Sequence, residues 1–390
     1  MERVAIETET VIVGASAAGI AAAACLSRER VPFVILEQSH AIGSPWRNHY
    51  ERLHLHTSKG LSGLPYFPFA RDVPRYPSRE QVVAYLEAYV EHFALMPCFG
   101  ERVVSIRREG DAWLTRSEGG AWRSRNVIIA TGNTRVPVRP SFVGIDTFAG
   151  TVVHSSEYTS GASFSGKRVL VVGFGNSGGE IAIDLCEHGA RPTVAVRSAV
   201  NVLPRDFLGL PILAWGIVLS LLPTWLADAI ANAVSRIAVG RLDRLGLRKL
   251  PHGPMTQIRR DGQVPLLDIG TVVRIKRGEI EVVHGVESFT ASGARFTDGS
   301  ERAFDCVVLA TGYRPALGAF LDGAADWLDQ EGAPPRSGTE LAPGLYCCGF
   351  YVAPTGMLRE IAREVKRIAD AIARGRRSRD EAPAPARDGL

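Results

Sequence analysis

The N-terminal part of the chain contains Thr10-Val-Ile-Val-Gly14-Ala-Ser16-Ala-Ala-Gly19, an apolar run that leads directly into a glycine-rich loop. A second segment of this kind lies near the middle of the chain and reads Arg168-Val-Leu-Val-Val-Gly173-Phe-Gly175-Asn176-Ser177-Gly178. A strand that turns tightly into a helix leaves backbone N–H groups unpaired at the helix start, and these groups attract a pyrophosphate. The two segments therefore predict an α/β fold with two Rossmann-like dinucleotide-binding domains.

The two loops differ at their middle position. The second has the full G-x-G-x-x-G pattern, in which glycines form the turn, admit the phosphate and let the helix pack on the strand. In the first, Ser16 replaces the middle glycine, and its small hydroxyl group could donate to a phosphate. Taken alone, the first loop is also compatible with a chance glycine turn. The predicted loop contacts are Gly14, Ser16 and Gly19 for one cofactor and Gly173, Gly175, Asn176, Ser177 and Gly178 for the other.

The strands that follow the loops end in residues of opposite charge. Phe33-Val-Ile-Leu-Glu37 places an acid about 20 residues after the first loop, where it can accept hydrogen bonds from ribose hydroxyls and repel a 2′-phosphate. Thr193-Val-Ala-Val-Arg197-Ser198 places a cation at the corresponding position, which favours a 2′-phosphate. We therefore predict FAD on the first loop with Glu37, and NADPH on the second with Arg197 and Ser198.

Length and composition are those of a globular protein. The 390 residues predict two domains, with three as the alternative, and the chain is 46% hydrophobic and 22% charged. The net charge of +4 is small, and much of the excess lies in Arg374-Gly-Arg-Arg-Ser-Arg379. We predict a disordered, solvated tail over residues 376–390 and no nucleic-acid partner. Binding of nucleic acid or anionic lipid by this tail is the alternative.

The cysteine pattern indicates a reducing compartment. Six cysteines are scattered without a C-x-x-C pair, which predicts a cytoplasmic location without disulfides or a zinc site. The pattern also weighs against a flavoprotein disulfide reductase, which needs a closely spaced redox pair. No group of His, Cys, Asp and Glu has metal-ligand spacing, so we predict no metal. The first strand begins close to the N-terminus, so no signal peptide is expected.

Residues 208–222 form an uncharged, apolar segment that contains Pro211 and is followed by Pro223. The segment is shorter than a membrane span, and Asp228 and Arg236 follow in an amphipathic continuation. We interpret it as apolar helices packed near the active site. Peripheral membrane contact is a less favoured alternative, and a true membrane span is the least favoured.

A second repeated element supports two related domains. Ala130-Thr131-Gly132-Asn133 and Ala310-Thr311-Gly312-Tyr313 each end a buried strand at a glycine turn that could pass a cofactor. The repetition predicts an NADPH-binding domain inserted in an FAD-binding domain. The predicted boundaries are 1–147 for the first part of the FAD domain, 148–290 for the NADPH domain with an apolar substrate or lid segment at 204–250, 291–375 for the second part of the FAD domain, and 376–390 for the tail.

From about residue 9 to residue 372, the chain resembles the class B flavin-dependent monooxygenases. Phe148-Ala-Gly150-Thr-Val-Val-His154-Ser-Ser-Glu-Tyr158 matches the fingerprint F-x-G-x-x-x-H-x-x-x-[Y/F] of that family. Baeyer–Villiger enzymes have Trp where this chain has Tyr158, which disfavours that subclass. The segment around Trp46 and Arg47 resembles the flavin-binding segment of the family, and the turn at Ala310-Thr-Gly-Tyr313 is a further family mark.

Within this family the chain resembles the YUCCA-type indole-3-pyruvate monooxygenases. Tyr50-Glu-Arg-Leu-His-Leu-His56 is similar to the Y-D-R-L-x-L-H segment of that branch, whereas animal-type enzymes carry Asn where His56 falls. Pro265-Leu-Leu-Asp268-Ile-Gly270 is also similar to the branch. The departures are Ser16 and the segment Phe350-Tyr-Val-Ala-Pro354. Because that segment lies at the expected active-site wall, the resemblance indicates the family more directly than it indicates the substrate.

The resemblance implies a reaction sequence and its partners. NADPH reduces FAD, the reduced flavin and O2 give a C4a-(hydro)peroxyflavin, and a small molecule is oxygenated. The adduct can attack an aromatic 2-oxo acid such as indole-3-pyruvate and release CO2, or it can transfer oxygen to a soft nitrogen or sulfur. A flavoprotein NADPH reductase and a non-enzymatic flavin-binding protein are further alternatives. The sequence gives no prediction of oligomeric state.

The candidate site residues are assigned by role. For His56, a contact with the flavin edge, gating of the substrate and plain packing all remain open. A 2-oxo acid needs a cation for its carboxylate, and Arg205, Arg248 and Lys249 are candidates. The predicted catalytic residues are Asn133, Asn176 and His56. The further predicted FAD contacts are Trp46, Arg47, Thr131, Gly132, Gly312, Thr355 and Gly356, and the predicted substrate contacts are Arg205, Trp215 and Lys249.

Overall fold

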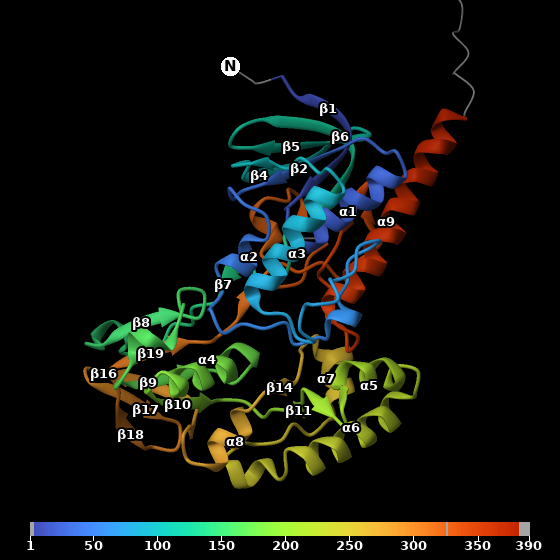
Figure 1. Ribbon diagram of the computed structural model, residues 1–390. Coiled ribbons are helices and arrows are strands. Elements are labelled where there is room, and N and C mark those ends of the chain that lie inside the picture. Colours follow the sequence, from blue (N-terminus) through green and yellow to red (C-terminus); the bar gives the residue numbers. More distant parts are fainter. Residues whose placement is uncertain (1–3, 325–326, 382–390) are drawn as a thin grey trace, which may run out of the picture.

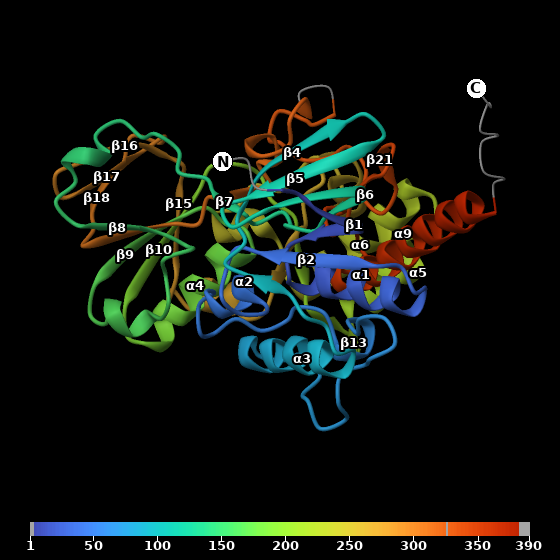
Figure 2. The ribbon, with the colours of Figure 1, turned by 90° about the horizontal axis from the view of Figure 1, so that it is seen from above.

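Each glycine loop follows a strand of its own parallel sheet. The computed structural model describes residues 4–324 and 327–381. Figures 1 and 2 show the two sheets in separate parts of the molecule. The first sheet has the order β21-β22-β6-β1-β2-β3, and its central strands run parallel. The pair β4–β5 extends it antiparallel to β6. Its strands are β1 (Ile6–Val13), β2 (Phe33–Glu37), β3 (Cys98–Phe99), β4 (Val103–Glu109), β5 (Ala112–Ser117), β6 (Ala121–Ile129), β21 (Glu340–Ala342) and β22 (Leu345–Cys347).

Helices cover one face of the first sheet. The alanine-rich helix α1 (Ala17–Arg28) lies against the sheet, with α3 (Arg79–His92) and α9 (Met357–Asp380) beside it (Figure 1). Alanine has the highest helix propensity and a small side chain, so α1 packs closely on its neighbours. The opposite face of the sheet packs on a second cluster that includes Trp113 and Phe320. Both faces of the central strands are therefore buried, as is usual for a parallel sheet.

The second sheet has the order β15-β10-β9-β19-β8, and all its strands are parallel. The helix α4 (Asn176–Glu187) follows its glycine loop. The strands are β8 (Thr151–His154), β9 (Arg168–Val172), β10 (Arg191–Val196), β15 (Glu281–His284) and β19 (Cys306–Leu309). Smaller sheets pair β16 (Val286–Thr290), β17 (Gly293–Phe296) and β18 (Glu301–Ala303); β11 (Val202–Pro204) with β14 (Leu266–Asp268); β12 (Asp206–Phe207) with β13 (Leu210–Pro211); and β7 (Val136–Pro137) with β20 (Tyr313–Arg314).

A helical cap extends from the second domain. Figure 1 shows α5, α6 and α7 together below the N-terminal start of α9. The cap has its own small hydrophobic cluster, which includes Leu219, Ala227 and Met255. The cap helices are α5 (Ile212–Leu219), α6 (Thr224–Ala238) and α7 (Pro254–Asp261). The other short helices are α2 (Ser44–Arg47), α8 (Thr271–Lys276), η1 (Lys59–Leu61), η2 (Ile145–Thr147), η3 (Gly161–Phe164), η4 (Leu242–Leu245) and η5 (Leu317–Ala319).

The strand pairing shows that the chain re-enters the first domain later than the predicted residue 291. Strand β19 pairs with β8 and β9 in the second sheet, so residues 306–309 belong with the NADPH-side domain. The chain rejoins the first sheet through β21 and β22. The boundary predicted at 290/291 is therefore wrong: the Ala310-Thr-Gly turn closes a strand of the second sheet, as the Ala130-Thr-Gly turn closes β6 of the first.

The C-terminal helix is longer than expected. Helix α9 continues to Asp380, so residues 376–380 of the predicted disordered tail are helical. The Arg376 guanidinium donates to the Arg30 carbonyl at 2.6 Å, and Arg379 pairs with Glu9. These contacts attach the basic end of α9 to the first domain, which explains why it remains helical. The prediction for residues 382–390 falls outside the described residues.

The segment predicted as apolar helices is partly a hairpin. Strands β12 and β13 form the hairpin, and Leu208 at its turn is exposed. The helix α5 begins only at Ile212. In residues 4–324 and 327–381, no helix combines the length and hydrophobicity needed to cross a bilayer.

Candidate active site

The glycine loops are shaped by close backbone approaches. A Cβ on Gly19 would lie 1.8 Å from the Gly14 carbonyl oxygen, and a Cβ on Gly178 would lie 2.2 Å from that of Gly173. Any larger side chain at Gly19 or Gly178 would push the helix away from the strand. The two loops therefore have the same internal packing, which supports one mode of dinucleotide binding for both.

The middle positions of the two loops share one backbone conformation. Ser16 has φ −97° and ψ −167°, and Gly175 has φ −92° and ψ −172°. Residues with side chains adopt this extended region freely, so Ser16 causes no backbone strain. The Ser16 side chain does not cap α1, and the first N–H groups of that helix remain available to a phosphate.

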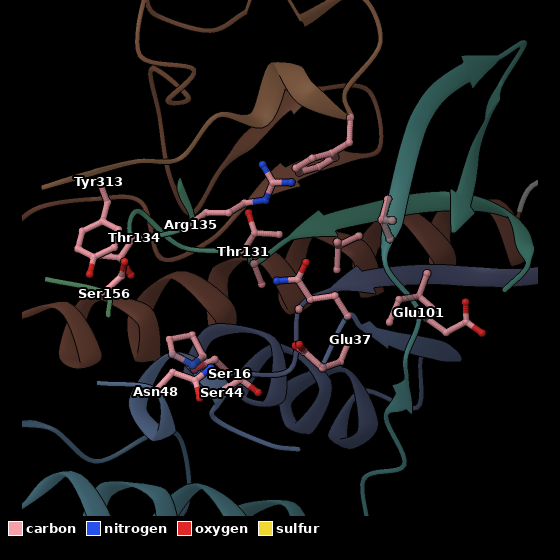
Figure 3. A pocket seen from close by; sticks show the side chains of 18 of the residues that line it. Ser16, Glu37, Ser44, Asn48, Glu101, Thr131, Thr134, Arg135, Ser156 and Tyr313 are labelled. Carbon is pink, nitrogen blue, oxygen red and sulfur yellow. The ribbon is translucent and has the colours of Figure 1, made fainter. Parts of the chain in front are cut away.

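A pocket of about 260 Å³ follows the first loop to the end of β2. Figure 3 shows Ser16, Glu37 and Thr131 around it. Glu37 accepts the Ala15 N–H at 2.7 Å, and its other carboxylate oxygen accepts the N–H and hydroxyl of Ser39. These bonds hold the carboxylate at the pocket wall, where its remaining lone pairs can accept from ribose hydroxyls.

Two buried polar atoms at this site lack a protein partner. The Thr131 hydroxyl and the His49 Nδ1 atom are buried without a hydrogen bond. Thr131 and His49 line both this pocket and the adjoining cavity. Because buried polar groups normally have partners, these atoms fit the polar edge of a bound flavin.

A larger cavity of about 460 Å³ opens beside the first pocket. We call it the apolar cavity, because most of the side chains around it are hydrophobic. The start of α1, the Thr131–Asn133 turn, the cap helices and the start of α9 surround it. Its size is that of a ligand pocket for a small aromatic molecule. Its hydrophobic lining includes Trp46, Leu203, Leu213, Trp215, Leu219, Ile230, Val234, Met255, Ile258, Val352, Pro354, Met357 and Ile361.

The sequence profile of the family described as "Flavin-binding monooxygenase-like" matches residues 7–327. The chain belongs to this family. The predicted resemblance and the predicted enzyme class, a flavin-dependent monooxygenase, are therefore confirmed.

Relatives that align with most of the chain include plant enzymes named as YUCCA indole-3-pyruvate monooxygenases. The chain is 43% identical over 350 residues to "Indole-3-pyruvate monooxygenase YUCCA1" of Oryza sativa subsp. japonica, with 87% of this chain and 86% of the relative covered. It is 38% identical over 383 residues to "Indole-3-pyruvate monooxygenase YUCCA6" of Arabidopsis thaliana, with 95% and 91% covered.

Solved structures share the fold of this monooxygenase. A flavin-containing monooxygenase from Stenotrophomonas maltophilia has 25% identity and a TM-score of 0.73, covering 95% of this chain and 99% of that one. An oxidised steroid monooxygenase bound to NADP has 20% identity and a TM-score of 0.76, covering 96% and 86%. The predicted fold class of two Rossmann-like domains is thus confirmed.

The apolar cavity of the monooxygenase brings together several of the predicted residues. The Asn133 amide donates to the Phe350 carbonyl at 3.1 Å. The Asn176 side-chain oxygen accepts the Leu267 N–H at 2.8 Å, which ties the start of α4 to β14. The predicted residues that line the cavity are Ser16, Trp46, His56, Thr131, Gly132, Asn133, Asn176, Trp215 and Gly356.

Other predicted residues lie away from this cavity. Arg205 stacks over the Tyr76 ring at 4.2 Å and does not line the cavity. Lys249 lines a separate surface depression with Arg236. Neither position favours a contact with a substrate in the apolar cavity.

Two predicted flavin contacts have protein partners instead. Arg47 donates to the Ile42 carbonyl at 2.9 Å and pairs with Glu87. The Thr355 hydroxyl hydrogen-bonds to Glu360.

On the NADPH side, Arg197 and Ser198 are exposed at the end of β10. The Arg248 guanidinium donates to the Arg197 carbonyl at 2.5 Å. A Cβ on Gly285 would lie 3.1 Å from the Arg197 Cα atom, so the backbone here is closely packed. The Arg197 position is thus fixed while its side chain faces solvent, which suits a contact with a 2′-phosphate. The turn at Gly312 has space for a ligand, because a Cβ there would have no neighbour within 4 Å.

The fingerprint residues His154 and Tyr158 make packing and hydrogen-bond contacts within the second domain. His154 is fully buried, and its ring packs edge-on against Tyr313 at 5.2 Å. Burial lowers the pKa of His154 below its usual value. The Tyr158 hydroxyl donates to Asp184 at 2.6 Å. This agrees with a structural role for the motif rather than proton transfer.

The sequence predictions missed an acidic face on α4. Glu180, Asp184 and Glu187 have helical i, i+4, i+7 spacing, which places them on one side of the helix. Glu180 accepts the Tyr50 hydroxyl at 2.5 Å and lies 3.1 Å from the His56 Nε2 atom. The helical spacing of acids in an otherwise apolar helix was the available signal. Glu187 on this face forms ion pairs with Arg52 at 2.8 Å and with Arg274 at 3.0 Å.

Arg135 is a second missed residue. It follows the Ala130-Thr-Gly turn and reaches the FAD-side pocket (Figure 3). Its guanidinium donates to the Ala316 carbonyl at 3.1 Å and stacks on Phe320. A cation at this wall is suited to a phosphate group.

Proposed function

We propose that this protein catalyses the NADPH- and FAD-dependent oxidative decarboxylation of an aromatic 2-oxo acid such as indole-3-pyruvate. Two relatives that align over most of the chain are named as indole-3-pyruvate monooxygenases. The observation that carries the proposal is the apolar cavity, which joins the FAD-side pocket through residues that line both.

The overall reaction balances with the two cofactors and O2. A 2-oxo acid, O2, NADPH and a proton give the acid one carbon shorter, CO2, NADP⁺ and water. The bond between the carboxylate carbon and the ketone carbon breaks, and a new bond joins the ketone carbon to an oxygen atom. When bound, FAD and NADPH supply the electrons and the activation of O2.

The protein contributes binding, orientation and exclusion of water. Glu37 would hold the FAD ribose, and the first turn of α1 would face its pyrophosphate. Arg197 would select NADPH through the 2′-phosphate. Trp215 and the other apolar side chains of the cap would keep water from the reacting atoms.

The test is an assay of the full-length, FAD-loaded protein with indole-3-pyruvate. NADPH oxidation, CO2 release and formation of the shortened acid should occur in equal amounts. NADPH oxidation without CO2, together with oxygenation of a thioether or amine, would replace this proposal with nitrogen or sulfur oxygenation. Anaerobic reduction of an artificial acceptor at an equal rate, with no oxygenated product, would point to the reductase alternative.

We also infer a cytoplasmic location without stable membrane attachment. The six cysteines, all within the described residues, are free thiols, which is typical of a reducing compartment. Fractionation of cells expressing the protein tests this, and recovery with membranes would contradict it.

A further inference from the structure

A 2-oxo acid brings a carboxylate into the apolar cavity, and the cavity offers few groups to receive it. No arginine or lysine is among the residues that line the described cavity. The ionisable side chains in that lining are three histidines, His49, His54 and His56. The carboxylate partner must therefore come from these histidines or from a neutral donor.

The three histidines differ in their surroundings. Burial lowers the pKa of His49, although the Glu180 charge acts in the opposite direction. His54 is exposed, and its Nδ1 atom lies 2.7 Å from the Arg52 carbonyl oxygen. His56 is half-buried, and its Nε2 atom lies 3.1 Å from Glu180 Oε1. Only His56, among the three, is hydrogen-bonded to a carboxylate.

Glu180 is built to hold His56 in one orientation. Its side chain is only 2% exposed, so its charge requires close partners. Its second oxygen accepts the Tyr50 hydroxyl at 2.5 Å. Burial, followed by the Glu180 charge, raises the pKa of Tyr50 well above its usual value, so Tyr50 remains a neutral donor. Other charged or titratable groups near this cluster include His49, Arg52, Arg79, Asp184 and Tyr313.

The remaining ring nitrogen of His56 is the free one. In the described part of the chain, Nδ1 of His56 has no hydrogen-bond partner, while the residue itself lines the cavity. When Nε2–H donates to Glu180, a protonated ring carries a second N–H at Nδ1. That N–H can bind an anion through a charge-assisted hydrogen bond.

We propose that His56 receives the carboxylate of the 2-oxo acid substrate and that Glu180 is the positioning residue that orients it. This inference rests on the proposed function, and it replaces the cations at Arg205 and Lys249 that the sequence suggested. The site selects acids over neutral aromatic molecules of the same shape.

The experiment compares two ligands that differ only in charge. Binding of indole-3-lactate and of the neutral indole-3-lactamide to the FAD-loaded protein with NADP⁺ is measured through the change in flavin absorbance. The native protein should prefer the acid by about 10- to 100-fold, as expected for one hydrogen bond to a charged group. The variant His56→Gln should lose most of this preference. His54→Gln is the matched control and should keep it.

Glu180→Gln preserves the shape and the hydrogen bond to Tyr50 but removes the charge. The acid preference should then weaken while binding of the neutral lactamide stays unchanged, because the His56 ring has lost its carboxylate partner. The KM for NADPH should stay unchanged. A merely structural role for Glu180 would change the binding of the acid and of the neutral lactamide equally.

The outcomes separate this inference from the proposed function. If the native protein releases CO2 from indole-3-pyruvate but His56→Gln keeps the full acid preference, the inference is wrong and the function stands. If no CO2 is released, the function itself fails. Should His56→Gln fail to fold, His56→Asn is measured in its place, and an unchanged acid preference in that variant excludes His56 as the receptor.

Discussion

Replacement of Arg197 by alanine should reduce the preference of the enzyme for NADPH over NADH. Arg197 lies at the end of β10, with its backbone fixed by Arg248 and by the close packing of Gly285. One hydrogen bond between charged groups contributes about 1.5–3 kcal/mol, which corresponds to about 10- to 100-fold in affinity. Because Arg197 is exposed, solvent screening places the expected loss near about 10-fold.

The assay measures kcat/KM for NADPH and for NADH at fixed ionic strength. In Arg197→Ala, kcat/KM for NADPH should fall while that for NADH changes little, and Arg197→Lys should be intermediate, because lysine keeps the charge without the bidentate geometry. Higher salt should reduce the NADPH preference of the native protein.

The control is Arg191→Ala, which removes an exposed arginine at the opposite end of the same strand. It should leave the NADPH/NADH ratio unchanged. An unchanged ratio in Arg197→Ala, or an equal loss with both nucleotides, would refute the assignment of Arg197 to the 2′-phosphate.

Three further predictions concern the second glycine loop, the wall of the apolar cavity and a surface ion pair. Gly178→Ala should lower the Tm and abolish NADPH binding, because its Cβ would lie 2.2 Å from a backbone oxygen. Gly175→Ala, whose Cβ would have no neighbour within 4 Å, should keep the Tm. Equal Tm values for the two variants would contradict the packing argument. Trp215→Ala should open the cavity wall and increase the H2O2 released per NADPH oxidised several-fold. A peroxidase-coupled assay measures this ratio, and an unchanged ratio would show that Trp215 does not exclude water. Hydrogen bonds from Arg168 lower the pKa of Asp305 to about 2, so this pair stabilises the fold above the usual carboxyl pKa of about 4 and the contribution is lost as pH falls toward 2. Asp305→Asn should reduce the change with pH of the free energy of unfolding in urea over that range. The reduction should be less than about 1 kcal/mol because the pair is exposed, and an unchanged pH dependence would contradict this.

Local patterns in the sequence were sufficient for the fold class and the cofactor loops. A strand, a glycine turn and a helix follow one another within a few residues, so their geometry depends on neighbours in the chain. The same holds for Glu37 and Arg197, which follow from the length of one β-α-β unit. The fingerprint from Phe148 to Tyr158 indicated the family, and the match of the family to residues 7–327 confirmed it.

The sequence patterns were less reliable where distant segments meet. The boundary predicted at residue 290 missed β19, because strand pairing between residues 306–309 and 169–172 leaves no local mark. The basic end of α9 had the composition of a disordered tail, and its order comes from contacts with residues such as Arg30.

The substrate site was decided by the tertiary structure. A carboxylate needs a cation, and on that ground the sequence suggested Arg205 and Lys249. Both lie outside the apolar cavity, because the spacing of residues along the chain does not predict the direction in which a side chain points. The Glu180–His56 pair joins α4 of one domain to a loop of the other. Such a contact forms only when the two domains pack. The sequence alone therefore determined which cofactors to expect, and the packing of the domains determined which ionisable side chains lie at the apolar cavity.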